Sequence, residues 1–148
     1  MKRHLPGRHH WGMEKNRIEN LIVDIKKYEE TLKSVLPSSF SAYEKADVKT
    51  KSTVERHLQL ISDLEQNVLI ALYKGLFEFF PTDIKDVFAK LSEKLRGTVI
   101  EEVKRRKLFR NKLIHAYIAG LYDRESFEQA KNLSDVDSFI DAIKKAIR

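Results

Sequence analysis

Apolar residues recur every three or four positions along nearly the whole chain, and this spacing is the feature that most restricts its fold. Such spacing places the apolar side chains on one face of a helix. No segment shows the strict alternation of apolar and polar residues that is typical of a strand. The clearest stripe comprises Ile18, Leu21, Ile22, Ile25, Tyr28, Leu32, Val35 and Leu36. The sequence therefore predicts an all-α protein.

The N-terminal half of the chain is predicted to form two long helices. The first begins just after Met13 and ends at Pro37, because proline has no amide hydrogen to continue a helix. The second runs to about Lys74, and its start has two candidates. Residues 41–44 have the spacing of a capping box, whereas Asp47 is a rival N-cap.

The C-terminal half is predicted to form a third and a fourth helix, a short helix and a last helix. A third helix is expected between the cap Thr82 and Gly97, and a fourth over residues 98–122. Asp123 is a candidate cap for a short helix, and Ser134 begins the last helix. Short links between long helices make neighbours antiparallel, so we expect an up-and-down bundle of four main helices plus short ones.

The length of 148 residues is sufficient for one domain with its own core. Residues 1–12 contain three basic and no acidic residues, and we expect them to be an appendage to a single domain over residues 13–148. His4, His9 and His10 of this segment could bind a metal, but a flexible polar tail is the favoured interpretation.

The absence of cysteine excludes disulfides and thiolate metal sites. The longest uncharged stretch near the middle of the chain, "QNVLIALY", is far shorter than the roughly 20 apolar residues of a membrane span. The first residues lack the apolar run of about 7–15 residues that a signal peptide needs. We therefore expect a cytoplasmic protein without a membrane segment.

The net charge of +6 is concentrated in two places. The first 12 residues contribute +3 and residues 104–112 contribute +6, so the remainder of the chain is net negative. This distribution favours a local anion-binding surface over general attraction. The expected RNA-contacting residues of the second cluster are Lys104, Arg105, Arg106, Lys107 and Lys112.

The predicted fourth helix carries two stripes. One arc, expected to face the core, comprises Phe109, Leu113, Ile114, Tyr117 and Leu121. A second stripe with coiled-coil spacing comprises Lys104, Leu108, Asn111, His115, Ile118 and Tyr122. A helix with two stripes is usually pressed between its own bundle and a second surface, so we expect a homodimer through the second stripe.

Arg110 and His115 have the chemistry of a phosphate-handling site. A guanidinium holds a phosphate through two parallel hydrogen bonds, and a histidine moves protons near neutral pH. Together they could cleave RNA without a metal, with the neighbouring 2′-hydroxyl as nucleophile. The two residues lie about 140° apart on a helical wheel. They therefore converge more easily on one phosphate if a partner chain supplies one of them.

The segment "FRNKLIHAY" resembles the signature of the HEPN superfamily in its HepT-like branch. In that signature an arginine, usually followed by a polar residue, precedes a histidine by five positions, and a tyrosine follows two positions later. Arg110, Asn111, His115 and Tyr117 match these positions. "VERHLQLISDLEQNVLIAL" is similar to the family's long second helix and "DVFAKLSEKL" to its third, so the resemblance covers most of residues 13–145.

The resemblance implies a metal-independent endoribonuclease toxin of a type VII toxin–antitoxin system, working as a homodimer without a cofactor. Arg110 would bind the phosphate, His115 would be the acid and base, and Asn111 would orient either of them. The implied antitoxin is a minimal nucleotidyltransferase that transfers AMP to the tyrosine of the motif, here Tyr117. A bulky anion there would repel RNA. The helical wheel also allows Tyr117 to be a core aromatic.

Two acids of the predicted second helix could orient Arg110 or His115. Asp63 lies where proteins of the resembled family tend to carry an acid, and Glu65 interrupts an apolar stripe. A surface salt bridge is the favoured interpretation for Glu65, while the role of Asp63 stays open.

Two other functions remain open from the sequence. One is a non-catalytic module that binds and positions a nucleotidyltransferase. The other is a protein that binds nucleic acid through the basic stripe without reading its sequence.

Overall fold

A computed structural model describes residues 7–77, 80–115 and 118–148 of the chain. Within these residues every regular element is a helix, which confirms the all-α prediction. The helices are α1 (Gly7–Val35), α2 (Phe40–Glu44), α3 (Val48–Phe77), α4 (Ile84–Leu91), α5 (Val99–His115), α6 (Asp123–Lys131) and α7 (Ser134–Ala146).

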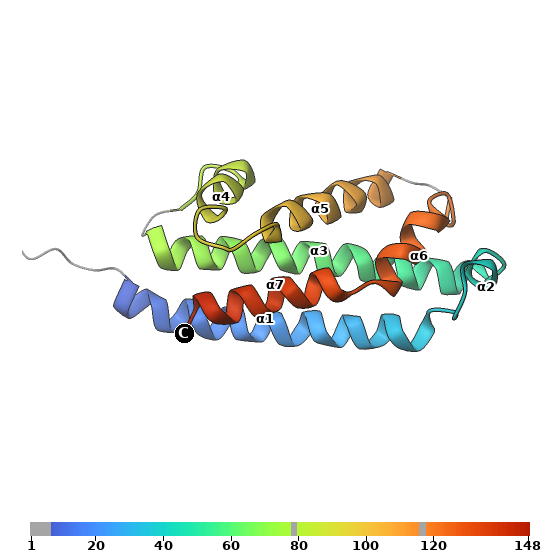
Figure 1. Ribbon diagram of the computed structural model, residues 1–148, viewed down its shortest axis with the longest axis horizontal. Coiled ribbons are helices and arrows are strands. Elements are labelled where there is room, and N and C mark those ends of the chain that lie inside the picture. The colour runs from blue at the N-terminus through green and yellow to red at the C-terminus, as the bar shows by residue number, and fades with distance from the viewer. Residues whose placement is uncertain (1–6, 78–79, 116–117) are drawn as a thin grey trace, which may run out of the picture.

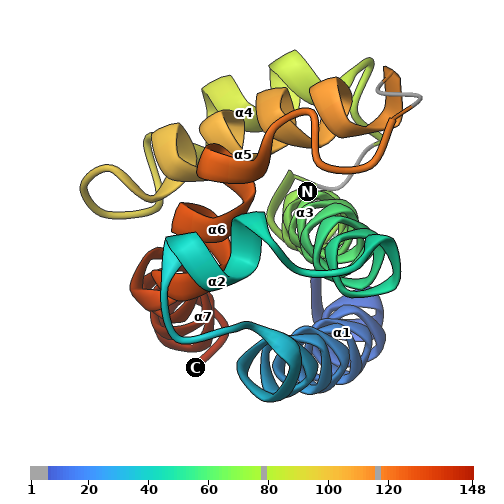
Figure 2. The same ribbon diagram turned by 90° about the vertical axis from the view of Figure 1, so that its right-hand side faces the viewer.

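The two longest helices, α1 and α3, lie side by side and make the most extensive contact between elements (Figure 1). The longer helices α1, α3, α5 and α7 follow one another in alternating directions. Viewed from one end, α5 and α4 lie over α3, and α7 lies beside α1 (Figure 2). The short helices α2 and α6 contact each other at the end where α1 meets α3.

The core lies between these helices and consists of the predicted apolar stripes. In α1 the residues Ile18, Ile22, Ile25 and Leu32 are buried, and in the last segment Val136, Phe139, Ile140, Ile143 and Ile147 are buried. Burying each such side chain contributes roughly 1.5–3 kcal/mol relative to leaving it in water. Amphipathic spacing therefore accounts for both the helices and the way they associate.

The beginning of α1 differs from the sequence prediction. The helix starts at Gly7 rather than after Met13, so the expected boundary at residue 12 falls inside it. Trp11 packs against the core at Gly75, where an added Cβ would lie only 2.0 Å from the indole ring. Gly75 is therefore a close-approach glycine within α3. His4 and the side chains at positions 9 and 10 lie outside the described residues.

The caps settle where three helices begin. Ser39 caps α2 by accepting the Ala42 N–H at 3.1 Å, so the capping-box start expected at residues 41–44 is wrong. Asp47 caps α3, which confirms the rival start. Asp83 rather than Thr82 caps α4, because its carboxylate accepts a backbone N–H of the first turn at 2.9 Å.

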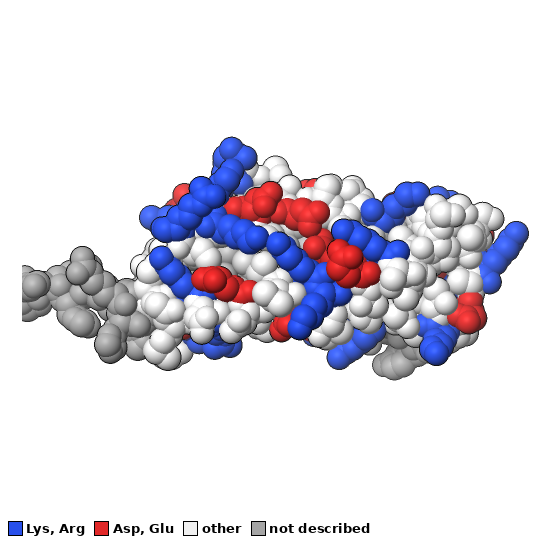
Figure 3. Space-filling model, turned by 90° about the horizontal axis from the view of Figure 1, so that it is seen from below, with Lys and Arg blue, Asp and Glu red and all other residues white. Residues whose placement is uncertain are grey.

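The faces of α1 and α7 carry both signs of charge. Figure 3 shows lysines and arginines lying beside aspartates and glutamates over this side of the molecule. Separately, none of the helices in the described segments is both long and apolar enough to cross a bilayer.

Candidate active site on α5

The core-facing side of α5 is narrower than predicted. Phe109 and Leu113 are buried as expected. Ile114 is 43% exposed and Leu121 is 60% exposed, so the prediction that they face the core is wrong. Leu121 lies beyond α5 in the turn toward α6, whereas Ile114 is within α5 but outside its buried side. Tyr117, the proposed modification site, lies outside the described residues.

The turn after α5 contains Gly120 in the left-handed region, with φ of 94°. It redirects the chain, so Ile118 and Tyr122 do not continue the second stripe along one helix. The predicted cap Asp123 is instead the first residue of α6, where its carboxylate pairs with Lys51 at 2.8 Å. The stripe on α5 itself is therefore limited to Lys104, Leu108, Asn111 and His115.

Arg110 is held from the side by α3. Its Nε donates to Asp63 Oδ1 at 2.8 Å, and both side chains are partly exposed. Its Nη1 donates to Asn111 Oδ1 at 3.2 Å. Asp63 and Asn111 thus fix two of the three guanidinium nitrogens of Arg110. A guanidinium fixed in this way is already oriented for one direction of approach.

His115 lies at the C-terminal end of α5 and is exposed. It borders an open groove between α5 and the start of α6. The groove is lined by Arg105, Leu108, Phe109, Asn111, Lys112, His115, Tyr122 and Glu125. Asn111 therefore contacts Arg110 and also borders the groove of His115. Arg110 itself does not line the groove, in keeping with the angular separation expected from the sequence.

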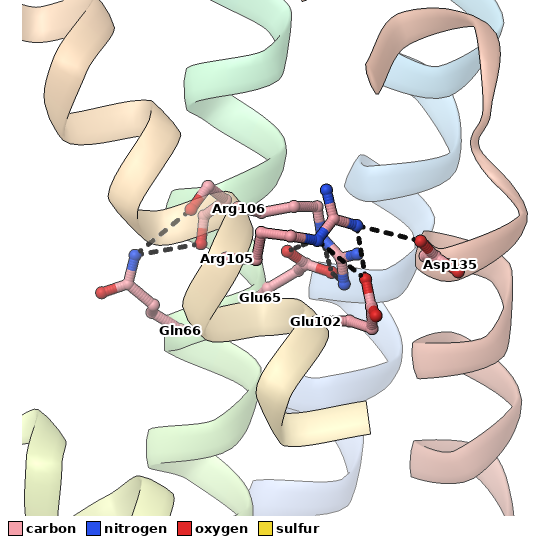
Figure 4. Close-up of polar contacts among 7 residues, drawn as sticks. Glu65, Gln66, Glu102, Arg105, Arg106 and Asp135 are labelled. Atoms are coloured by element: carbon pink, nitrogen blue, oxygen red, sulfur yellow. Dashed lines mark hydrogen bonds and ion pairs between the residues drawn. The ribbon is translucent and has the colours of Figure 1, made fainter. Parts of the chain in front are cut away.

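Acidic partners offset much of the predicted basic surface. Arg105 pairs with Glu102 and with Asp135, the latter at 3.0 Å (Figure 4). The hydrogen bond from Arg105 lowers the pKa of Glu102 and raises that of Arg105 itself. Two further pairs are Lys104 with Glu101 and Lys112 with Glu125. Lys107 makes no ion pair with any part of the chain that the structure describes.

Arg106 points into the protein and pairs with Glu65. The Arg106 side chain is 7% exposed and that of Glu65 is fully buried. Nε donates to both carboxylate oxygens at 2.8 and 3.1 Å, and Nη2 donates at 2.6 Å (Figure 4). Burial raises the pKa of Glu65, while the Arg106 guanidinium opposes this. The prediction of Arg106 as an RNA contact is therefore wrong, and the Glu65 salt bridge is buried rather than on the surface.

The sequence did not predict that residues at the start of α6 line the groove. Tyr122 and Glu125 both line it, although the sequence placed Tyr122 on a continuous fourth helix. The isolated Gly120 was the sequence signal from which an earlier end of that helix could have been predicted. As for metal ligands, the described ranges contain no group of three or more His, Asp or Glu side chains that could hold a metal ion.

The comparisons with known proteins give no family for this chain. No protein-family model matches it, and the search of curated proteins found no match. A function must therefore be argued from the site and its chemistry.

Proposed function

We propose that the chain is a metal-independent endoribonuclease of the HEPN type, an up-and-down helical bundle whose active site forms between two copies. The observation that carries this proposal is the link made by Asn111. Its side chain accepts from Arg110 and lines the groove that His115 borders, so Asn111 connects the phosphate-binding arginine to the groove of the histidine. In the proposal Arg110 binds the phosphate, His115 transfers protons and Asn111 orients them.

Asp63 prepares Arg110 for this role. The carboxylate holds Nε, and Asn111 holds Nη1, so the guanidinium loses little freedom when a phosphate binds. A positive group aimed at the phosphate stabilises the charge that develops on its oxygens during cleavage. Because Asp63 and Arg110 are both partly exposed, an incoming phosphate can reach the pair.

The reaction needs two proton transfers. The ribose 2′-oxygen attacks phosphorus, and the bond from phosphorus to the 5′-oxygen breaks. The 2′-hydroxyl gives up its proton to a base, and the leaving 5′-oxygen takes one from an acid, which yields a 2′,3′-cyclic phosphate and a 5′-hydroxyl. In the proposal the His115 of one chain takes the proton of the 2′-hydroxyl as base and then gives it to the leaving 5′-oxygen as acid, opposite the Arg110 of the second chain.

An exposed apolar residue beside the site supports the pairing of two copies. Leu108 is 64% exposed and lies one turn before Asn111 and two turns before His115 on the same face of α5. Its burial against a second α5 would bring the two sets of polar residues together. Exposed apolar surface of this kind commonly marks an interaction site.

In the proposed cycle a minimal nucleotidyltransferase partner silences the enzyme by transferring AMP from ATP to the Tyr117 hydroxyl, with pyrophosphate as the leaving group. RNA reaches the site past Lys104, Arg105, Lys107 and Lys112. The acidic partners of most of these residues argue against the alternative of a simple nucleic-acid-binding protein, because a paired stripe attracts a polyanion only weakly.

Cleavage of RNA by the purified full-length protein tests the proposal. The wild type should cut single-stranded RNA and leave cyclic phosphate ends, and His115→Ala should lower the rate at least about 100-fold with the fold intact. His57→Ala is the matched histidine control, since His57 lies on α3 against Tyr28 and outside the groove. Equal cleavage by wild type and His115→Ala, or none by the wild type, would contradict the proposal.

A further inference from the structure

Tyr122 is the aromatic wall of the groove that contains His115. It lies between α5 and α6, and its ring stands edge-on to Phe109, with centroids 6.2 Å apart at 80°. The ammonium of Lys112 lies 5.9 Å from the centre of the ring. The ring is partly exposed and lines the groove, so part of its surface is accessible there.

Two anchors on α3 hold the backbone on both sides of Tyr122. Glu55 accepts the Gly120 N–H at 3.0 Å, and Lys51 pairs with Asp123 at 2.8 Å. Glu55 and Lys51 are one helical turn apart, and Tyr122 lies between the two points they hold. The ring is thus positioned before any ligand arrives.

The turn also depends on a glycine. Gly120 has φ of 94°, and a Cβ there would lie 3.1 Å from Asp123 Oδ1 and 3.3 Å from Lys51 Nζ. The close approach lets α3 hold this turn directly. Such a connection resembles a preformed binding surface more than a spacer between helices.

The groove combines apolar and basic residues in the manner of a site for a nucleotide. Leu108 and Tyr122 offer apolar surface beside the buried Phe109, while Lys112, paired with Glu125, and Arg105, paired with Glu102 and Asp135, lie at the border of the groove. Proteins that bind single strands place bases on aromatic rings and phosphates on nearby cations. A base is flat and uncharged, so it suits the apolar part of the groove better than a phosphate does.

We propose that Tyr122 is a base-stacking residue, on which an RNA base rests while the adjoining phosphate lies toward His115, and that Glu55 and Lys51 position it. This inference rests on the proposed function in taking RNA as the ligand, and it adds the group that holds the strand beside the scissile phosphate. Tyr122 is a binding residue in this assignment, whereas Glu55 and Lys51 act through the turn.

The test measures binding separately from cleavage. The full-length protein is titrated against a fluorescein-labelled single-stranded 2′-O-methyl oligonucleotide, which lacks the attacking hydroxyl, and fluorescence anisotropy reports affinity. Tyr122→Leu should weaken binding about 5- to 100-fold, and Tyr122→Phe should stay within about twofold of the wild type. Phe80→Leu is the matched control, because Phe80 is an exposed aromatic beside Lys74 and does not line the groove.

The positioning role is read from a second pair of variants. Glu55→Ala should weaken binding in the same direction as Tyr122→Leu, and Glu55→Gln should restore it, because an amide oxygen still accepts the Gly120 N–H. Circular dichroism confirms that each variant is folded. Equal losses for Glu55→Ala and Glu55→Gln would overturn the positioning role.

The outcomes separate this inference from the proposed function. Binding by Tyr122→Leu at wild-type affinity overturns the stacking role even if RNA is cleaved normally. Loss of the dimer in Tyr122→Leu, measured by sedimentation, overturns it in favour of a contact between protein chains. Normal binding by the wild type without cleavage, together with loss in Tyr122→Leu, supports stacking while the proposed nuclease function fails.

Discussion

Arg106 and Arg110 lie one turn apart on α5, yet their surroundings differ and so do their expected roles. Arg106 is buried and pairs with a fully buried Glu65, whereas Arg110 pairs with Asp63 at a partly exposed position. A buried pair cannot exchange its partner for a substrate without exposing an uncompensated charge. A partly exposed pair can. The buried pair of Arg106 and Glu65 therefore holds α5 to α3, and the partly exposed Arg110 is available to a phosphate.

Removing one member of the buried pair should destabilise the fold strongly. Glu65→Ala leaves the Arg106 guanidinium buried without its counter-charge, and we expect a loss of about 3–5 kcal/mol in the free energy of unfolding. Urea denaturation followed by circular dichroism measures it. The double variant Glu65→Leu with Arg106→Leu should recover much of this loss. A double variant no more stable than Glu65→Ala would contradict the explanation.

Removing the charge of Asp63 should affect catalysis rather than folding. Asp63→Asn keeps a side chain of similar size but weakens its hold on Arg110, so we expect roughly a 10- to 100-fold lower rate of RNA cleavage. The free energy of unfolding should change by less than about 1 kcal/mol, because the pair is partly exposed. Glu101→Gln, which removes the acid of another ion pair on α5, is the control for a general charge effect. Full activity in Asp63→Asn would remove Asp63 from the site.

At the scale of the elements, the contact between α1 and α7 contains a buried acid. Glu29 on α1 is almost fully buried, and burial followed by the neighbouring carboxyl of Asp137 raises its pKa from 4.5 to about 8. Lys33 and Lys26 on its own helix oppose this shift only in part. The protonated form of Glu29 is therefore the form that the folded state prefers.

The sign of the resulting pH dependence follows from a raised pKa. The contribution of Glu29 to the free energy of unfolding is complete below pH 4.5, where the folded and the unfolded state both hold the proton. It is lost as the pH rises toward 8. Glu29→Gln should remove this decline and be more stable than the wild type at pH 8 by roughly 1–3 kcal/mol. Urea titrations at pH 5 and pH 8 measure the difference. An unchanged slope with pH in Glu29→Gln would show that another group is responsible.

Periodicity predicted the helices well, and it failed where a tertiary contact decided the outcome. The stripes of α1 and α7 are buried as expected because an amphipathic helix has only one way to remove its apolar face from water. The apolar pattern of α5 continues past His115, yet residues 118–122 form a turn rather than a helix. Gly120 and Asp123 in and after this turn are held by Glu55 and Lys51, which belong to a helix distant in sequence.

Part of the candidate site was predictable because it depends only on the geometry of a single helix. The spacing of Arg110 and His115 is local, and the angle between them follows from the geometry of a helix. The pairing of Arg110 with Asp63 was one of the options that the sequence left open. The burial of Arg106 was not predictable, because it depends on which side of α5 packs against α3. Tyr122 was missed as a groove wall because its place depends on the turn.

At the scale of the whole molecule, the arrangement of α5 over α3 leaves one face of α5 uncovered by the rest of the described chain. That face holds Leu108, Asn111 and His115, while Arg110 is turned toward Asp63 on α3. One chain therefore presents its two proposed catalytic groups in different directions. A second copy related by a two-fold axis can place the His115 of one chain opposite the Arg110 of the other.

Complementation between two inactive variants tests this central claim most directly. Arg110→Ala and His115→Ala are co-expressed with different affinity tags, and tandem purification isolates dimers that contain one chain of each. If each site takes its arginine and histidine from different chains, one of the two sites is intact, and the mixed dimer should cleave RNA at about half the wild-type rate. Each homodimer should be inactive. A mixed dimer as inactive as either parent would contradict a site shared between two chains.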